Sequence, residues 1–382
     1  MNIALLRFWI VSTIFIVLPF GILDPFWWPK AACYLIGAAF FIPGSTYRES
    51  DPALDWLLRY LAIMFIFYIT WPILSARPDS SGQGAHIAYE PWRVIPSLIA
   101  ITSLILINRL QILTESQWVQ VAWTLTLCAA LLSIIGILQY FRIYQWIVPA
   151  QDGSAPSRMV SVFGNQMLTA NFLAITAPLF LMFRKWWLGW LLCLLAILLA
   201  DNNAGKLALL IGLAAFFVMQ RHVWIPAILG LGTLILCGFA YPHMDDGGRF
   251  GMIHQAMDAW KDGMTPYFGY GLGRLYATFN LAGKHIGSAF ASTHNEWVDG
   301  LFEIGIVGMG LVLWFAARLI RNVWVAKPNI TLSCYTASLV SAACVSMFSF
   351  PLKVAGVLIT IVLAIAACLS LSTGGKHGYV PA

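Results

Sequence analysis

Long apolar runs, bounded by proline, glycine and charged residues, dominate this chain and predict membrane-spanning helices. A helix that crosses a bilayer needs about 20 predominantly apolar residues. The runs lie at residues 4–23, 29–44, 56–74, 93–108, 118–141, 166–183, 186–200, 204–220, 223–241, 294–317, 330–350 and 353–372. Those at 29–44, 93–108 and 186–200 are marginal in length for a full crossing, so the exact helix count stays open. The pattern predicts an all-α polytopic membrane protein with about 12 transmembrane helices.

The composition agrees with this pattern and leaves little chain for anything else. Of the 382 residues, 60% are hydrophobic and only 10% are charged, whereas a soluble domain has about 25% charged residues. We therefore expect residues 1–382 to form a single transmembrane domain without an added soluble catalytic domain. The 7 cysteines fall in apolar runs without a CxxC pair, which indicates packing residues rather than disulfides or zinc ligands.

The longest stretch between predicted spans covers residues 242–293 and carries a helical pattern of its own. Five apolar residues in it recur at helical spacing and would share one face: Phe250, Ile253, Met257, Trp260 and Met264. This predicts a short helix that lies in the membrane interface or packs on neighbouring protein, and both alternatives remain open.

The distribution of basic residues predicts the orientation in the membrane. An even number of spans puts both termini on one side, and the basic residues divide equally between the two sides. Very short connectors, which dominate orientation, lie on the side of the termini at Arg184-Lys185 and at residues 220–222. We therefore expect cytoplasmic termini, and segment 242–293 as a long loop on the opposite face.

Residues 293–308 carry the most informative polar pattern. If they form one helix, His294 lies at the membrane edge on the same face as Gly305 and Gly308, where another helix can approach closely. The opposite face carries the carboxylates of Glu296, Asp299 and Glu303. An ionised Glu303 inside the bilayer would be costly unless it is paired.

The sequence His294-Asn295, nine residues, then Gly305-x-x-Gly308 resembles the signature of the O-antigen ligase/O-antigen polymerase (Wzy_C) superfamily of polytopic membrane glycosyltransferases. Other segments are similar to motifs of the family in the same order: residues 158–171 (RMVSVFGNQMLTAN), 204–209, Arg249 with the run through Gly271, and 350–353. The first 150 residues match the family only in being spans.

The resemblance implies a GT-C-like fold in the bacterial inner membrane, with an active site that faces the periplasm. It implies a glycan donor carried on undecaprenyl pyrophosphate, and His294 as the catalytic residue beside the acceptor hydroxyl. Binding of the donor pyrophosphate falls to Arg249, Lys206 and Arg158. Supporting positions are Asn295, Glu303 and Arg274.

Some of these residues have plainer alternatives. Lys206 stands where ligases more often have Arg, and a lysine supplies a point charge rather than a bidentate fork. Arg158 and Arg274 either touch the donor or position their loops. Arg249 could instead begin the interfacial helix or bind lipid phosphate, and a lone histidine at the membrane edge is often structural.

The chemistry is consistent with these residue types. Cleavage of a sugar–pyrophosphate bond develops negative charge on the leaving group, which fixed cations stabilise. The attacking hydroxyl needs a base that titrates near neutral pH, as histidine does. We expect such a transfer to invert the configuration at the sugar carbon. We also expect no metal or other cofactor, because the adjacent acids Asp245-Asp246 are more typical of a solvated loop than of a metal site.

Three functions remain in order of preference. The first is transfer of the glycan onto lipid A-core, as in an O-antigen ligase of lipopolysaccharide biosynthesis. The second is an O-antigen or exopolysaccharide polymerase that extends a lipid-linked glycan. The third is a flippase or transporter of such a glycan, which is disfavoured because no internal repeat is visible. The expected partners are donor, acceptor and membrane lipids, with no nucleic acid.

Overall fold

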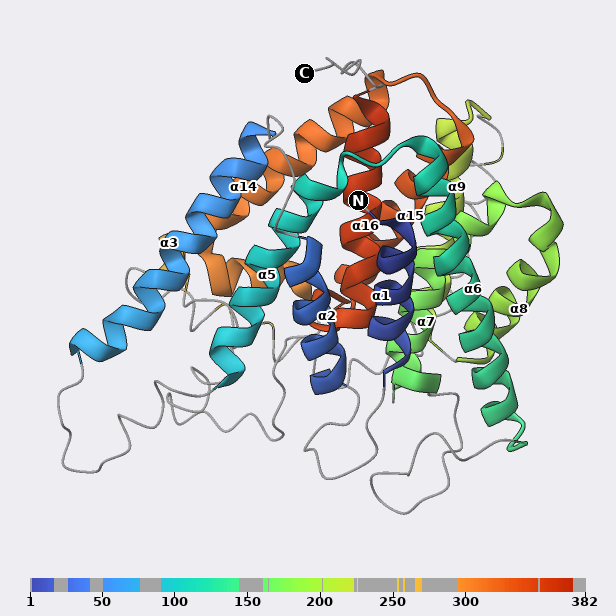
Figure 1. Cartoon of the computed structure of the whole chain (residues 1–382), viewed down its shortest axis with the longest axis horizontal. Coiled ribbons are helices and arrows are strands. Elements are labelled where there is room, and N and C mark those ends of the chain that lie inside the picture. The colour runs from blue at the N-terminus through green and yellow to red at the C-terminus, as the bar shows by residue number, and fades with distance from the viewer. Residues whose placement is uncertain are drawn as a thin grey trace. The chain divides into compact units, whose positions relative to one another are not determined.

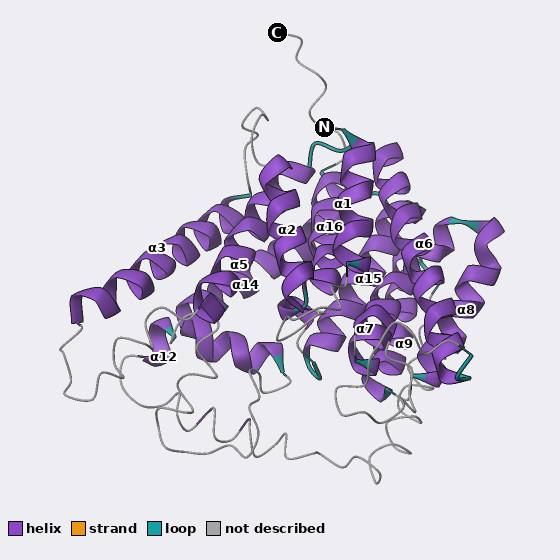
Figure 2. Ribbon diagram, turned by 60° about the horizontal axis from the view of Figure 1, so that its bottom comes forward, coloured by secondary structure: helices purple, strands orange, loops and turns teal. Residues whose placement is uncertain are grey.

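The computed structural model describes most of the predicted spans. Its described residues are 2–16, 27–41, 51–75, 91–143, 161–163, 165–200, 202–222, 265–269, 295–349 and 351–373, with the single residues 225, 253 and 257. Helices account for most of this described part, and it contains no strand (Figure 2). The all-α class is therefore confirmed.

The chain divides into two compact units. Unit 1 comprises Met1–Gly44, Arg109–Met244 and Leu319–Ala382, and unit 2 comprises Ser45–Asn108 and Asp245–Arg318. The described helices of unit 1 are α1 (Ile3–Phe15), α2 (Trp27–Phe41), α6 (Glu115–Tyr140), α7 (Gln166–Thr176), α8 (Trp187–Leu199), α9 (Asn203–Met219), α15 (Ile330–Ser346) and α16 (Ala355–Ser372). Short 3-10 helices lie at Ser161–Phe163, Ala177–Met182, Arg184–Trp186 and Pro351–Lys353. The prediction of one transmembrane domain over residues 1–382 stays a prediction.

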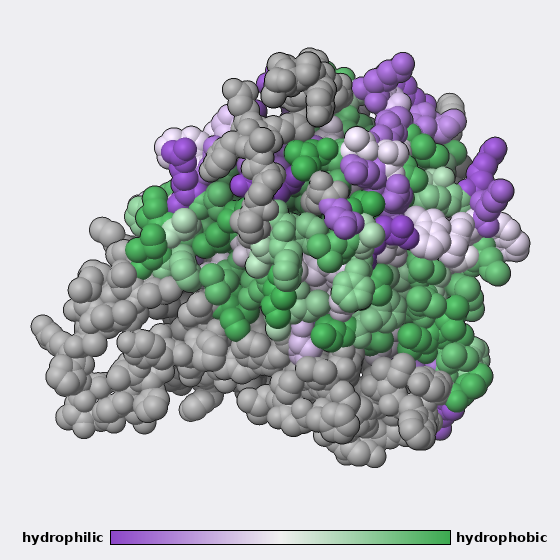
Figure 3. Space-filling model, in the orientation of Figure 1, coloured by the Kyte–Doolittle hydropathy of each residue, from purple (hydrophilic) through white to green (hydrophobic). Residues whose placement is uncertain are grey.

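Helix α16 is the core of unit 1. It packs against α1, α2, α7 and α15, and most of its side chains are buried (Figure 1). An apolar helix surrounded on several sides needs no polar face, which explains why its sequence is apolar all round. Apolar side chains also cover the visible face of α6 and α8, with polar ones gathered toward the end at which α6 begins (Figure 3).

Polar side chains join the helix ends at that end of unit 1. The Asn329 amide and the Thr331 hydroxyl both donate to the Glu115 carboxylate, at 3.1 and 3.0 Å. The Ser370 hydroxyl donates to the Leu113 carbonyl at 2.9 Å. Hydrogen bonds of this kind satisfy backbone and side-chain groups where helices end, and they tie the start of α6 to the start of α15 and the end of α16.

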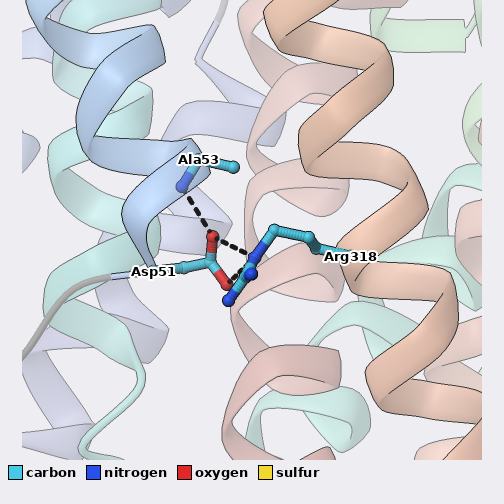
Figure 4. A network of polar contacts seen from close by, with 3 residues as sticks. All are labelled: Asp51, Ala53 and Arg318. Atoms are coloured by element: carbon cyan, nitrogen blue, oxygen red, sulfur yellow. Dashed lines mark hydrogen bonds and ion pairs between the residues drawn. The ribbon is translucent and has the colours of Figure 1, made fainter.

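Unit 2 contains α3 (Pro52–Ser75), α5 (Pro91–Leu110), the single turn α12 (Thr265–Phe268) and α14 (Glu296–Val325), whose last turns belong to unit 1. A cluster of Leu57, Leu61 and Ile304 forms its buried core, with side chains of α5 packed against it. Asp51 caps the start of α3 and pairs with Arg318 of α14 at 3.0 Å (Figure 4).

Every predicted span except 223–241 overlaps a described helix; residues 17–23 of the first span and almost all of 223–241 lie outside the described residues. By length and composition, α6, α14 and α16 are suited to cross a membrane, and shorter apolar helices accompany them. The described helices are therefore apolar, as the sequence predicts for a membrane protein. The number of about 12 crossings and the GT-C-like arrangement remain predictions.

Candidate functional site

The structure describes the predicted catalytic segment from Asn295 onward, at the start of α14. Asn295 is the residue before the helix, and its side-chain oxygen accepts hydrogen bonds from the backbone N–H groups of Trp297 and Val298, at 3.0 and 3.2 Å. Asparagine is a strong N-cap because it satisfies donors that the first turn leaves unpaired. Asn295, predicted as a supporting residue, is thus the N-cap of α14. It directly follows His294 in the chain.

The first half of α14 buries two carboxylates. Asp299 is fully buried and Glu303 is 5% exposed, and the two lie one helical turn apart. These two carboxylates belong to the acidic face predicted for this segment, and its third member, Glu296, is partly exposed. Buried carboxylates in a bilayer are costly and are retained mainly where they have a role, so this half-helix is the strongest functional candidate among the described residues of unit 2.

The prediction of one continuous helix through Gly308 is wrong. Gly305 has φ 67° and ψ −175°, which breaks α14 into two halves. This backbone conformation is accessible to glycine and strained for other residues. A Cβ atom at Gly305 would lie 2.5 Å from both the Gly269 nitrogen and the Tyr267 oxygen. Gly305 therefore permits a backbone break packed on the Gly269 turn, not a helix–helix contact.

Gly308 has the role that the spacing predicted. A Cβ atom there would lie 2.8 Å from Cε1 of Tyr60, so the missing side chain gives room to a residue of α3. The Tyr60 hydroxyl donates to the Ile304 carbonyl oxygen at 2.7 Å. The sequence analysis missed Tyr60, because an aromatic residue inside an apolar span resembles any other packing residue and lies far along the chain from α14.

Lys206 belongs to unit 1, in the first turn of α9. Asn202 caps this helix by accepting from Ala204 and Gly205, at 2.9 and 3.3 Å. The Asn202 amide also donates to the Met167 carbonyl at 3.3 Å, and Gly205 packs closely on Ala170 of α7. These contacts hold the partly exposed Lys206 beside the start of α7.

Residues in or next to two further predicted motif segments, 158–171 and 350–353, meet in unit 1. The Asn171 amide donates to the Ser349 hydroxyl at 2.8 Å, and both residues are fully buried. A Cβ atom at Gly356 would lie 2.8 Å from Cε1 of Phe163. Phe163 and Asn171 of the first segment therefore lie beside Gly356 and Ser349, which flank the second segment; Asn171 and Ser349 are 178 residues apart in the chain.

Lys30 is a second cation in this part of unit 1 that sequence analysis counted only toward the charge balance. It is 1% exposed, and its Nζ donates to the Ile16 carbonyl at the end of α1, 2.7 Å away. The same nitrogen lies 5.6 Å from the centre of the Phe163 ring. A helix C-terminus and an aromatic face both favour a cation, which explains how this lysine is buried. No local sequence signal could have shown this environment.

The remaining predicted site residues lie outside the described residues: His294, Arg249, Arg158 and Arg274. The predicted interfacial helix at 250–264 also lies there, apart from the isolated residues 253 and 257. Within the described part of the chain, no group of three or more His, Cys, Asp or Glu side chains could hold a metal ion.

Comparison with known proteins adds no relative: no protein-family model matches the chain, and no curated protein matches it.

Proposed function

We propose that this protein is an inverting membrane glycosyltransferase of the O-antigen ligase kind. It transfers a glycan from undecaprenyl pyrophosphate onto lipid A-core at the periplasmic face of the bacterial inner membrane. The observation that carries the proposal is the start of α14, where a capped helix follows His294 directly and buries Asp299 and Glu303 within its first turns. A structural helix start in a membrane would need neither buried carboxylate.

The reaction follows from the residue types. An acceptor hydroxyl oxygen attacks C1 of the first sugar, the bond from C1 to the phosphate oxygen breaks, and undecaprenyl pyrophosphate leaves with the bond electrons. His294 takes the proton of the attacking hydroxyl as general base. The configuration at C1 is inverted in this single displacement.

Cationic side chains stabilise the departing pyrophosphate. Lys206, Arg249 and Arg158 are the proposed set, and Lys206 is the described member. Its position in the first turn of α9, beside the capped start of α7, supports this role, because helix N-termini and a lysine both favour an anion. These cations take the part that a metal ion plays in other glycosyl transfers, so the proposed reaction needs no metal.

The testing experiment uses purified full-length protein in lipid nanodiscs with EDTA. Undecaprenyl-pyrophosphate glycan is offered with lipid A-core, or alone at high concentration. Glycosylated lipid A-core supports the ligase function, and glycan extension on the lipid carrier supports a polymerase instead. The absence of both products, with a His294→Ala variant that leaves glycan assembly in cells intact, would contradict the proposal.

A matched pair of lysine variants tests the donor site. Lys206→Ala should lower kcat/KM for the donor roughly 10- to 100-fold, as expected for loss of one charge-assisted contact to a phosphate. Lys185→Ala is the control, because Lys185 is an exposed lysine in the connector before α8. Equal effects of the two substitutions would remove Lys206 from the donor site.

A further inference from the structure

The break in α14 leaves backbone groups that a regular helix would pair. The helix stops at Ile304 and resumes beyond Gly305. Carbonyl groups before a break and N–H groups after it have no partners within the helix. In a membrane-spanning segment such groups must be satisfied by other parts of the protein.

Tyr60 of α3 supplies this connection in unit 2. Its hydroxyl lies 2.7 Å from the Ile304 carbonyl oxygen and 3.2 Å from the Phe268 carbonyl oxygen. One hydroxyl therefore contacts both the carbonyl that precedes the break and the last residue of the α12 turn.

The surrounding glycines make room for this arrangement. Gly308 lacks the Cβ atom that would meet the Tyr60 ring, and Gly269 has φ 76° where its backbone lies against Glu303 and Gly305. Three segments that are distant in sequence, α3, the α12 turn and the break in α14, thus meet at one phenolic oxygen.

We infer that Tyr60 is a positioning residue, which fixes the half-helix of residues 296–304 against the rest of α14. That half-helix buries Asp299 and Glu303 and begins directly after His294 and Asn295. The effect of Tyr60 on catalysis rests on the proposed function, whereas its effect on the position of the half-helix does not. A displacement of about 1 Å at a reacting group can lower a rate about 100-fold.

The test is the Tyr60→Phe variant of the full-length protein in nanodiscs, which removes the hydroxyl and keeps the ring. Hydrogen–deuterium exchange is measured for peptides that cover residues 265–269 and 304–308, and kcat and donor KM are measured for glycan transfer. We expect exchange in these peptides to rise about fivefold or more, kcat to fall roughly 10- to 100-fold, and donor KM to stay within about twofold. Exchange across α16, in unit 1, should not change.

Tyr140→Phe is the matched control, because Tyr140 is a partly exposed tyrosine at the end of α6 in unit 1. It should leave both readouts at the wild-type level. If Tyr60→Phe does not accumulate, Gly308→Ala displaces the ring while keeping the hydroxyl, and the same changes are expected.

The outcomes separate the inference from the proposed function. Faster exchange in Tyr60→Phe supports the positioning role even if the wild-type protein transfers no glycan, a result that would contradict only the proposed function. Wild-type transfer with unchanged exchange and kcat in Tyr60→Phe overturns the inference. A lower kcat without faster exchange overturns it as well, because the hydroxyl would then act other than by holding the break.

Discussion

One carboxylate, Asp51, both begins α3 and fastens it to α14. Its side-chain oxygen accepts from the Ala53 N–H at 2.9 Å, as an N-cap does, and both of its oxygens lie 3.0 Å from Nε of Arg318 (Figure 4). The Arg318 side chain is 38% exposed and that of Asp51 is 9% exposed. The cap is local to α3, whereas the ion pair joins two helices of unit 2.

Two substitutions at Asp51 should separate these contributions. Asp51→Asn keeps an oxygen for the cap and loses the ion pair, and we expect a loss of less than about 1 kcal/mol because solvent screens Arg318. Asp51→Ala loses the cap too, which costs about 1 kcal/mol more. Thermal unfolding in nanodiscs measures both, with Arg318→Ala as the control for the pair. Identical losses in the two Asp51 variants would mean that the cap adds nothing.

At the scale of the element, the glycines of α14 have different surroundings and different physical roles. Gly305 occupies a left-handed backbone conformation against the Gly269 turn, and Gly308 makes room for Tyr60. Gly310 follows in the second half of the helix, and a Cβ atom there would meet nothing within 4 Å. Spacing in the sequence cannot distinguish these three glycines, because it records position along the helix but not its backbone conformation.

Alanine substitutions at Gly305 and Gly310 should therefore change the free energy of unfolding in opposite directions. Gly305→Ala forces a strained backbone and a steric clash, and we expect a loss on the order of 1–3 kcal/mol. Gly310→Ala lies in open helix and should stabilise by up to about 1 kcal/mol, because alanine loses less backbone entropy than glycine. Reversible unfolding in mild detergent measures the pair. A destabilised Gly310→Ala, or an unaffected Gly305→Ala, would contradict this account of the break.

At the scale of the whole molecule, unit 1 carries exposed basic residues on short connectors at one end. Arg7 lies over the Trp123 ring at 5.3 Å, and the same ring contacts Trp186 at 5.9 Å between centroids. The exposed Arg184 and Lys185 thus lie at the end where the chain begins. Short basic connectors favour the cytoplasmic side, which supports the predicted orientation although the basic residues divide evenly over the chain.

Cysteine labelling tests this orientation across α8, a helix of 13 residues. Lys185→Cys and Asn203→Cys are placed at exposed positions before and after that helix. A membrane-impermeant maleimide should label Asn203→Cys in intact spheroplasts, and Lys185→Cys only after permeabilisation. Cys33, which is partly exposed, and Cys237 are replaced by serine in both variants; the other native thiols, Cys128, Cys193, Cys334, Cys344 and Cys368, are buried and should give little background. Labelling of both positions from one side would show that α8 does not cross the bilayer.

Prediction from sequence succeeded where the signal is local. The apolar runs at 29–44, 93–108 and 186–200 were marginal by length, and each coincides with a described helix. The acidic face was also predicted, because Glu296, Asp299 and Glu303 recur at helical spacing, but the burial of Asp299 and Glu303 was not. Beyond Gly305 the same reasoning failed, because helical periodicity assumes an unbroken helix.

Apolar periodicity is encoded within a few turns of chain, and for that reason the all-α class and the helices themselves could be predicted without coordinates. The break at Gly305, the Tyr60 hydroxyl that bridges it and the burial of Lys30 against Ile16 depend on segments far apart in the chain. Such contacts exist only once the helices have packed, since it is packing that removes water and leaves each buried polar group to find its partner within the protein.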